Sequence, residues 1–221
     1  MFDKLVRSSR RTLSIEINSK LEVIVRSPNR ASIADINNFV LKHKNWIDQK
    51  KNFIRNKKAA KAPIYGLELG KLLFIGKEYE AVKDNSIKSI LNFDGKIFKY
   101  NSENTVQQRQ SLELWYKLQA RKVIENRITI FSDQMNIKYK KWRISNAEHR
   151  WGSCSSKGTI SLNWRLILAP LTIIDYVVIH ELAHLKQMNH SISFWNIVSL
   201  YDSNFKSHRN WLKKNDSLLY F

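Results

Sequence analysis

The segment that decides the fold and the chemistry of this chain spans residues 171–190 and reads LTIIDYVVIHELAHLKQMNH. Its first half is apolar on nearly every side, a pattern that predicts a helix buried in the core. Thr172 is a residue type favoured at a helix N-cap, and Asp175 follows it, near the positive end of the helix dipole. We therefore expect a buried helix that begins at Thr172.

Two histidines and a glutamate on this helix have the spacing of a metal centre. His180 and His184 are four residues apart, so their imidazoles project from one face and can bind one tetrahedral ion. Glu181 can accept a proton from a metal-bound water, whose pKa the ion lowers to around 7. Left unpaired in a buried helix, these groups would cost several kcal/mol each. The pattern predicts an HExxH active-site helix with Glu181 as general base.

A third ligand is expected from His190. Asn189 tolerates a left-handed conformation, so it can end the helix and turn the chain back towards the first two histidines. Three protein ligands plus water form the open, catalytic type of zinc site. We expect one Zn²⁺ per chain, although the ligand type also permits cobalt, nickel or manganese. A further helix over residues 191–201 is expected to pack Phe194 and Trp195 beneath this turn.

A second informative segment, residues 150–158, reads RWGSCSSKG and predicts strand, tight turn and strand. A hairpin edge beside the metal could bind a substrate backbone by strand addition, which makes Gly152, Ser153 and Ser155 candidate substrate-binding residues. The alternative is a purely structural turn that places Trp151 in the core.

Two arginines are candidates for binding substrate charge. Arg150 could stabilise an oxyanion or a phosphate, and a surface salt bridge is the alternative for its side chain. Arg165 could help to hold phosphates. Cys154, the single cysteine, excludes an internal disulfide, and we expect it to pack as a small buried hydrophobe rather than to act as a fourth ligand.

Outside these segments, hydrophobic periodicity predicts an α+β fold in two parts. Residues 1–104 are expected to form a mainly β unit with one helix, and residues 105–221 a domain that carries the metal centre. Strands are expected as a hairpin over residues 12–26 and at 71–75, 78–82, 87–92, 96–100, 137–144 and 159–166; helices at 32–55, capped by Ser32, and at 107–134; and a basic loop at 56–63.

Charge and composition bound the function more loosely. The net charge of +19 and the pI of about 10.0 suit a polyanionic partner, such as a weakly associated nucleic acid, but an AT-rich genome would produce the same abundance of lysine, asparagine and isoleucine. The start of the chain has no apolar secretory segment, and the longest apolar stretch, 166–179, is shorter than the ~20 residues of a membrane span. We expect a soluble, cytoplasmic protein without a membrane partner.

In combination, these motifs resemble one family. Residues 150–166, the segment from His180 to His190 and the following Ser191-x-x-Phe194-Trp195 closely resemble the YgjP-like metallopeptidases, which are zincin relatives of the SprT-like and WLM proteases. The hairpin near the N-terminus extends the resemblance over almost the whole chain. The resemblance implies a zincin-like domain over residues 105–221, with zinc held by the three histidines and Glu181 as the catalytic carboxylate.

The resemblance leaves the substrate open. Peptide or protein hydrolysis is the leading interpretation, because the family is named for metal-dependent peptidases. Some relatives are described as pyrophosphatases that act on the nucleotide UTP, and the SprT-like and WLM relatives cleave proteins attached to DNA. A basic nucleic-acid-binding module without activity is a further alternative, but a purely structural zinc site has no need of a general base such as Glu181.

Overall fold

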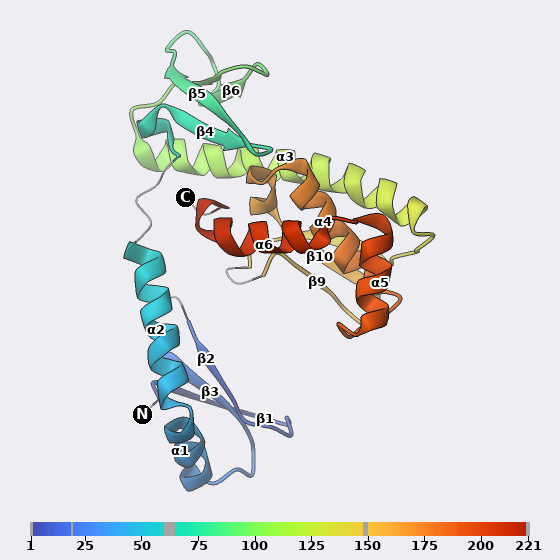
Figure 1. Cartoon of the computed structure of the whole chain (residues 1–221). Helices are drawn as coiled ribbons and strands as arrows, with labels where there is room; N and C mark the ends of the chain where they lie inside the picture. Colours follow the sequence, from blue (N-terminus) through green and yellow to red (C-terminus); the bar gives the residue numbers. More distant parts are fainter. Residues whose placement is uncertain (1, 19, 60–64, 148–149, 220–221) are drawn as a thin grey trace. The chain divides into compact units, whose positions relative to one another are not determined.

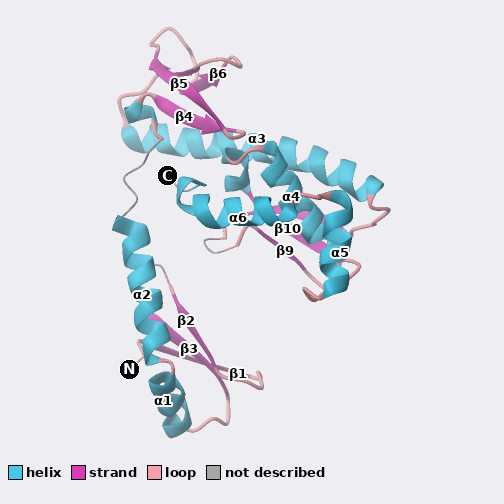
Figure 2. Cartoon of the chain, viewed as in Figure 1, coloured by secondary structure: helices cyan, strands magenta, loops and turns pink. Residues whose placement is uncertain are grey.

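Helices and strands are mixed throughout the computed structural model of the chain, which describes residues 2–18, 20–59, 65–147 and 150–219 (Figure 2). The chain divides into two compact units, Met1–Ala62 and Pro63–Phe221 (Figure 1). The predicted α+β class is confirmed in this coarse form. Within the described residues, no helix combines the length and the apolar character that crossing a bilayer requires.

The first unit is a three-stranded sheet with two helices. The predicted hairpin is confirmed as β2 (Ser14–Ile17) and β3 (Val23–Pro28), which pair antiparallel, while β1 (Lys4–Ser8), which was not predicted, pairs parallel to β3. Helices α1 (Ile33–Lys42) and α2 (Lys44–Ala59) follow in the chain. A separate apolar core holds this unit together and consists of Ile17, Val23, Val25, Ile36, Val40 and Ile47.

The single helix predicted over residues 32–55 is interrupted at His43. Ser32 caps α1 as predicted, since its side chain accepts a hydrogen bond from the backbone N–H of Asp35. At His43 the backbone N–H bonds the carbonyl of Val40, three residues back, which tightens the last turn and ends α1. The basic loop predicted at 56–63 was wrong in its first part, because α2 continues to Ala59; residues 60–63 lie outside the described residues.

The second unit begins with a four-stranded sheet of order β4-β5-β7-β6. Its strands are β4 (Lys71–Phe74), β5 (Lys77–Lys83), β6 (Leu91–Phe93) and β7 (Phe98–Tyr100); the strand predicted at 87–92 begins only at Leu91. Edge-to-face ring contacts join this sheet to the helix that follows, as between Phe98 and Trp115 with centroids 4.9 Å apart. The sheet therefore packs within the second unit, and the two units divide at residue 62, not near the predicted boundary at 104.

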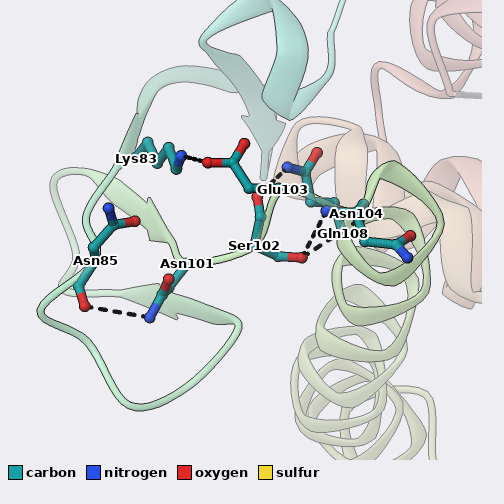
Figure 3. A network of polar contacts seen from close by, with 7 residues as sticks. All are labelled: Lys83, Asn85, Asn101, Ser102, Glu103, Asn104 and Gln108. Atoms are coloured by element: carbon teal, nitrogen blue, oxygen red, sulfur yellow. Dashed lines mark hydrogen bonds and ion pairs between the residues drawn. The ribbon is translucent and has the colours of Figure 1, made fainter.

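The predicted long helix is confirmed as α3 (Thr105–Gln134), two residues longer at its start. Its N-terminus is closed by a polar network (Figure 3). The side chain of Asn104 accepts the backbone N–H groups of Val106 and Gln107, and Gln108 Nε2 donates to the carbonyl of Ser102 at 2.6 Å. The two bonds to Asn104 satisfy orphan N–H groups of the first turn, so the helix begins at residue 105.

A second small sheet lies beside the candidate site and has the strand order β8-β10-β9. Strand β10 (Thr159–Asn163) pairs parallel with β8 (Lys141–Ser145) and antiparallel with β9 (Gly152–Cys154). The strands predicted at 137–144 and 159–166 are thus shorter than expected, and residues Trp164–Leu168 instead form the 3₁₀ helix η2. Strand β9 lies at the edge of this sheet, with β10 as its partner among the described residues.

The predicted buried helix is confirmed as α4 (Leu171–Ala183), which packs against α3, β9, α5 (Ile192–Tyr201) and α6 (Phe205–Asn215). Thr172 was the wrong N-cap. The proline before the helix takes that position, because its ring fixes an extended conformation and its carbonyl accepts the first helical hydrogen bonds.

Asp175 does not stabilise the helix start, since it lies beyond the first turn of α4. Its carboxylate instead accepts two hydrogen bonds from the guanidinium of Arg127 on α3, at 2.5 and 2.9 Å. Both side chains are about four-fifths buried, so this ion pair fixes α4 against α3.

Candidate metal centre

The last turn of α4 carries His180 and Glu181, and His184 is its C-cap. Beyond it the chain turns at once, through hydrogen bonds from the N–H of Leu185 to the carbonyl of Leu182 and from Lys186 to Ala183. The helix therefore ends well before Asn189, where the sequence predicted its end. Asn189 is also not left-handed, because the non-glycine residues with positive φ in the described chain are Leu21, Ile75 and Asn136.

The turn brings the third histidine beside the first two. The ring centroid of His190 lies 5.0 Å from that of His180 and 4.8 Å from that of His184, and the His180 and His184 centroids are 5.0 Å apart. The Nε2 atoms of His180 and His190 are separated by 3.1 Å. One nitrogen from each ring lies within 4.8 Å of the other two, so three candidate ligand atoms converge.

This donor set fits a divalent metal ion. Nitrogens bound to one tetrahedral zinc ion at about 2.0–2.1 Å are about 3.3 Å apart, close to the separation of the His180 and His190 Nε2 atoms. The Nδ1 atom of His184 donates to the carbonyl of Gln187 at 3.2 Å, which leaves its Nε2 lone pair free for a ligand. The Nδ1 atom of His180 is buried without a hydrogen-bond partner among the described residues.

The electrostatics of the centre favour neutral rings. Burial, followed by the charges of the other two histidines, lowers the pKa of His180 to about 3. Burial also lowers the pKa of His184. Neutral imidazole is the form that binds metal, so the lowered pKa values of His180 and His184 favour binding of an ion.

An aromatic floor supports the three rings, as the sequence predicted. Ser191 caps α5 and places Phe194 beneath the cluster, with its ring centroid 4.9, 4.6 and 4.8 Å from those of the three histidines. Trp195 stacks on His190, with centroids 5.6 Å apart and planes inclined by 23°. These contacts restrict the orientation of the histidine rings.

Glu181 lies against the edge strand β9. Glu181 is only 5% exposed, and this burial raises the pKa of its carboxyl group to about 8. A Cβ atom built on Gly152 would lie 2.7 and 2.8 Å from Cγ and Cδ of Glu181, and still closer to its Oε1. The carboxylate therefore occupies the space of a missing side chain, and Gly152 has to be glycine for that reason.

We expect Gly152→Ala to lower catalytic efficiency by about 10²-fold, because the added methyl group displaces the carboxylate of Glu181 by roughly an ångström. None of the nearest atoms that the added methyl group would meet belongs to the three histidines, so the variant should still bind metal. Hydrolytic activity and metal content of the purified variant would be measured together.

Gly66→Ala is the matched control for this substitution. A Cβ there would lie 2.6 Å from Oε1 of Glu68, the same kind of overlap, but Glu68 is exposed and can swing away. Normal activity of Gly152→Ala would show that the position of the Glu181 carboxylate is unimportant.

The other predicted residues of the hairpin have different surroundings. Ser153 lies on β9 opposite Ser161 of β10. Ser155 closes the hairpin, because its N–H donates to the carbonyl of Thr159 at 2.9 Å and its hydroxyl accepts the N–H of Thr159 at 3.1 Å. Cys154 is half-buried, and burial followed by the charge of Glu181 raises its thiol pKa to about 11.

The two arginines predicted to bind substrate differ in their contacts with the rest of the chain. Arg150 is exposed just before β9, and its carbonyl accepts a hydrogen bond from Nδ2 of Asn163 at 3.1 Å. Arg165 donates from Nη1 to Asn146 Oδ1 at 2.6 Å and stacks over the ring of Trp164 at 4.5 Å. The side chain of Arg165 is thus held by the fold.

One residue beside the centre was not predicted from the sequence. Arg209 on α6 stacks over the ring of Trp195, with its guanidinium carbon 5.0 Å from the ring centroid. It lies far from the histidines in the chain and belongs to no motif, so no local pattern could have indicated it.

Comparisons with known proteins found one family model and two similar solved structures. A family model for the YgjP-like metallopeptidase domain matches residues 11–215. The chain is similar to the crystal structure of the metallopeptidase zymogen abylysin of Pyrococcus abyssi, with 28% identity and a TM-score of 0.38 over 41% of this chain and 93% of that one. For the zymogen jannalysin of Methanocaldococcus jannaschii the values are 20%, 0.37, 41% and 94%. None of the curated proteins matches the sequence.

Proposed function

The chain belongs to the YgjP-like metallopeptidase family, and from this membership we propose that it is a zinc-dependent peptidase whose ion is held by His180, His184 and His190. One observation carries the proposal. The three histidine rings converge at the end of α4, and the neighbouring carboxylate of Glu181 touches the edge strand β9. In this proposal, Glu181 acts as a base between a metal site and a peptide-binding edge.

Zinc suits these ligands, because three neutral imidazoles with one open position are the donor set of catalytic zinc sites. When bound, the ion would supply Lewis acidity towards water and towards the scissile carbonyl. The chain itself orients the rings. Phe194 lies under all three, and the backbone carbonyl of Gln187 accepts a hydrogen bond from Nδ1 of His184.

In this proposal Glu181 moves the proton. A carboxylate oxygen of Glu181 accepts a proton from the attacking water and then delivers it to the nitrogen of the leaving amine. Its nearly complete burial keeps bulk water away from the carboxylate, and the absence of a side chain at Gly152 leaves room for it.

The edge of β9 that has no partner strand among the described residues is the proposed binding surface for the substrate backbone. An edge strand presents unpaired N–H and C=O groups, to which an extended peptide adds as a further strand. Gly152 and Ser153 contribute this edge, and the exposed Arg150 at its start is the proposed donor to a developing oxyanion. In the proposal, Ser155 and Arg165 have structural roles. Ser155 closes the hairpin through its hydrogen bond to Thr159, and Arg165 binds the side chain of Asn146.

The experiment that tests the function compares substrate classes directly. The zinc-loaded protein would be incubated with an unstructured protein, with and without DNA, and separately with UTP. We expect cleavage of peptide bonds that a chelator abolishes and added zinc restores. Hydrolysis of UTP without any peptide cleavage would contradict the peptidase proposal.

A further inference from the structure

An exposed cation reaches the candidate metal centre from helix α6. The guanidinium of Arg209 stacks on Trp195, and Trp195 stacks on the ring of His190, so two ring contacts link the arginine to the histidine cluster. The ring of Trp195 also lies close to that of His180, with centroids 5.8 Å apart. The arginine is therefore part of the electrostatic surroundings of the site.

Arg209 has no acidic partner within the part of the chain that the structure describes. The carboxylate of Asp202, seven residues before Arg209, is bound by Nδ1 of His208 at 2.8 Å. The guanidinium carbon lies 5.0 Å over the ring of Trp195, and Arg209 is exposed, so its N–H donors are accessible to a ligand. An exposed guanidinium without an acidic partner among the described residues thus lies beside the candidate metal centre.

We infer that Arg209 binds a carboxylate of the substrate and gives the protein a preference for peptides with an acidic group near the cleaved bond. This inference rests on the proposed peptidase function. A guanidinium binds a carboxylate through two parallel hydrogen bonds, a geometry that a lysine ammonium does not provide. The stack on Trp195 restricts the arginine before substrate arrives, which reduces the entropy lost on binding.

The carboxylate can come from an acidic side chain or from the C-terminus of a peptide, and peptide design separates the two. One cleaved peptide would be prepared with glutamate or glutamine at each position around the scissile bond, and each version with a free or an amidated C-terminus. We expect kcat/KM to be about 10- to 100-fold higher for one acidic version. The responsive position, or the free C-terminus, identifies the source.

Substitution of the arginine tests the assignment. In Arg209→Gln we expect the ratio of kcat/KM between the acidic and neutral peptides to fall to about one, and in Arg209→Glu we expect a lysine at the same position to become favourable. Lys213→Gln is the matched control, because Lys213 is exposed one turn further along α6 and its loss changes the net charge equally. This control should keep the wild-type ratio.

A binding measurement separates this inference from the proposed function. Mercaptoacetyl dipeptides, which bind zinc through their thiol, would be titrated into the zinc-loaded protein by calorimetry, with glutamate compared with glutamine. A preference for glutamate that disappears in Arg209→Gln supports the carboxylate site even if no peptide is cleaved. An unchanged ratio in Arg209→Gln, or an effect of this variant on UTP hydrolysis alone, would overturn the inference.

Discussion

Replacing Glu181 with glutamine is expected to lower kcat/KM for peptide hydrolysis by about 10²–10⁴-fold, the usual contribution of a positioned general base. Glutamine has the same shape, so it fills the space beside Gly152 and leaves the packing of α4 unchanged. It cannot accept the proton of the attacking water, because its amide is not basic. Initial rates on a cleaved peptide and the zinc content of the variant would be measured in parallel.

Glu125→Gln is a suitable control, because Glu125 is exposed on α3 and its loss changes the net charge by the same amount. We expect this control to retain full activity. Full activity in Glu181→Gln would remove the carboxylate from the mechanism. Loss of zinc from Glu181→Gln would instead make the carboxylate a ligand of the ion.

The second large effect is expected at the third histidine. His190→Ala should weaken zinc binding by more than about 100-fold, since even residues that only support a ligand are worth 10- to 100-fold in affinity. Two imidazoles from one helix would then remain, and the nitrogen that lies 3.1 Å from Nε2 of His180 would be absent. Competition with a chromophoric chelator measures the affinity, and peptide hydrolysis should disappear with the metal.

His43→Ala removes one histidine from the first unit and tests whether zinc loss is specific. His43 ends α1 and lies outside the cluster that could hold an ion. We expect the His43→Ala variant to bind one zinc ion per chain with unchanged affinity. A stoichiometric zinc ion that stays bound with wild-type affinity in His190→Ala would contradict the three-histidine site.

Much of the fold follows from neighbours along the chain. The alternating apolar residues around the first hairpin form β2 and β3, and the apolar stripe after residue 104 forms α3. Both predictions succeeded because each pattern places its apolar side chains on one face of a strand or helix. The single helix predicted over residues 32–55 was wrong at His43, where a hydrogen bond to the carbonyl of Val40 ends α1.

The candidate site also contains features that the sequence predicts and features that it does not. Positions four apart on a helix lie on one face in any structure, so the pairing of His180 with His184 could be predicted from spacing alone. The sequence predicted that His190 lies close to the other two histidines. It placed the turn at the wrong residue, because the turn begins directly after α4 and not at Asn189.

The sequence by itself determined a buried helix with two histidines and a glutamate at its end, since helical periodicity depends only on local backbone geometry. Only the tertiary structure decided that the carboxylate of Glu181 fills the space at Gly152 and that Arg209 reaches the site through Trp195. Such contacts join residues that are distant in the chain. They depend on how whole elements pack, and no spacing along the sequence encodes that packing.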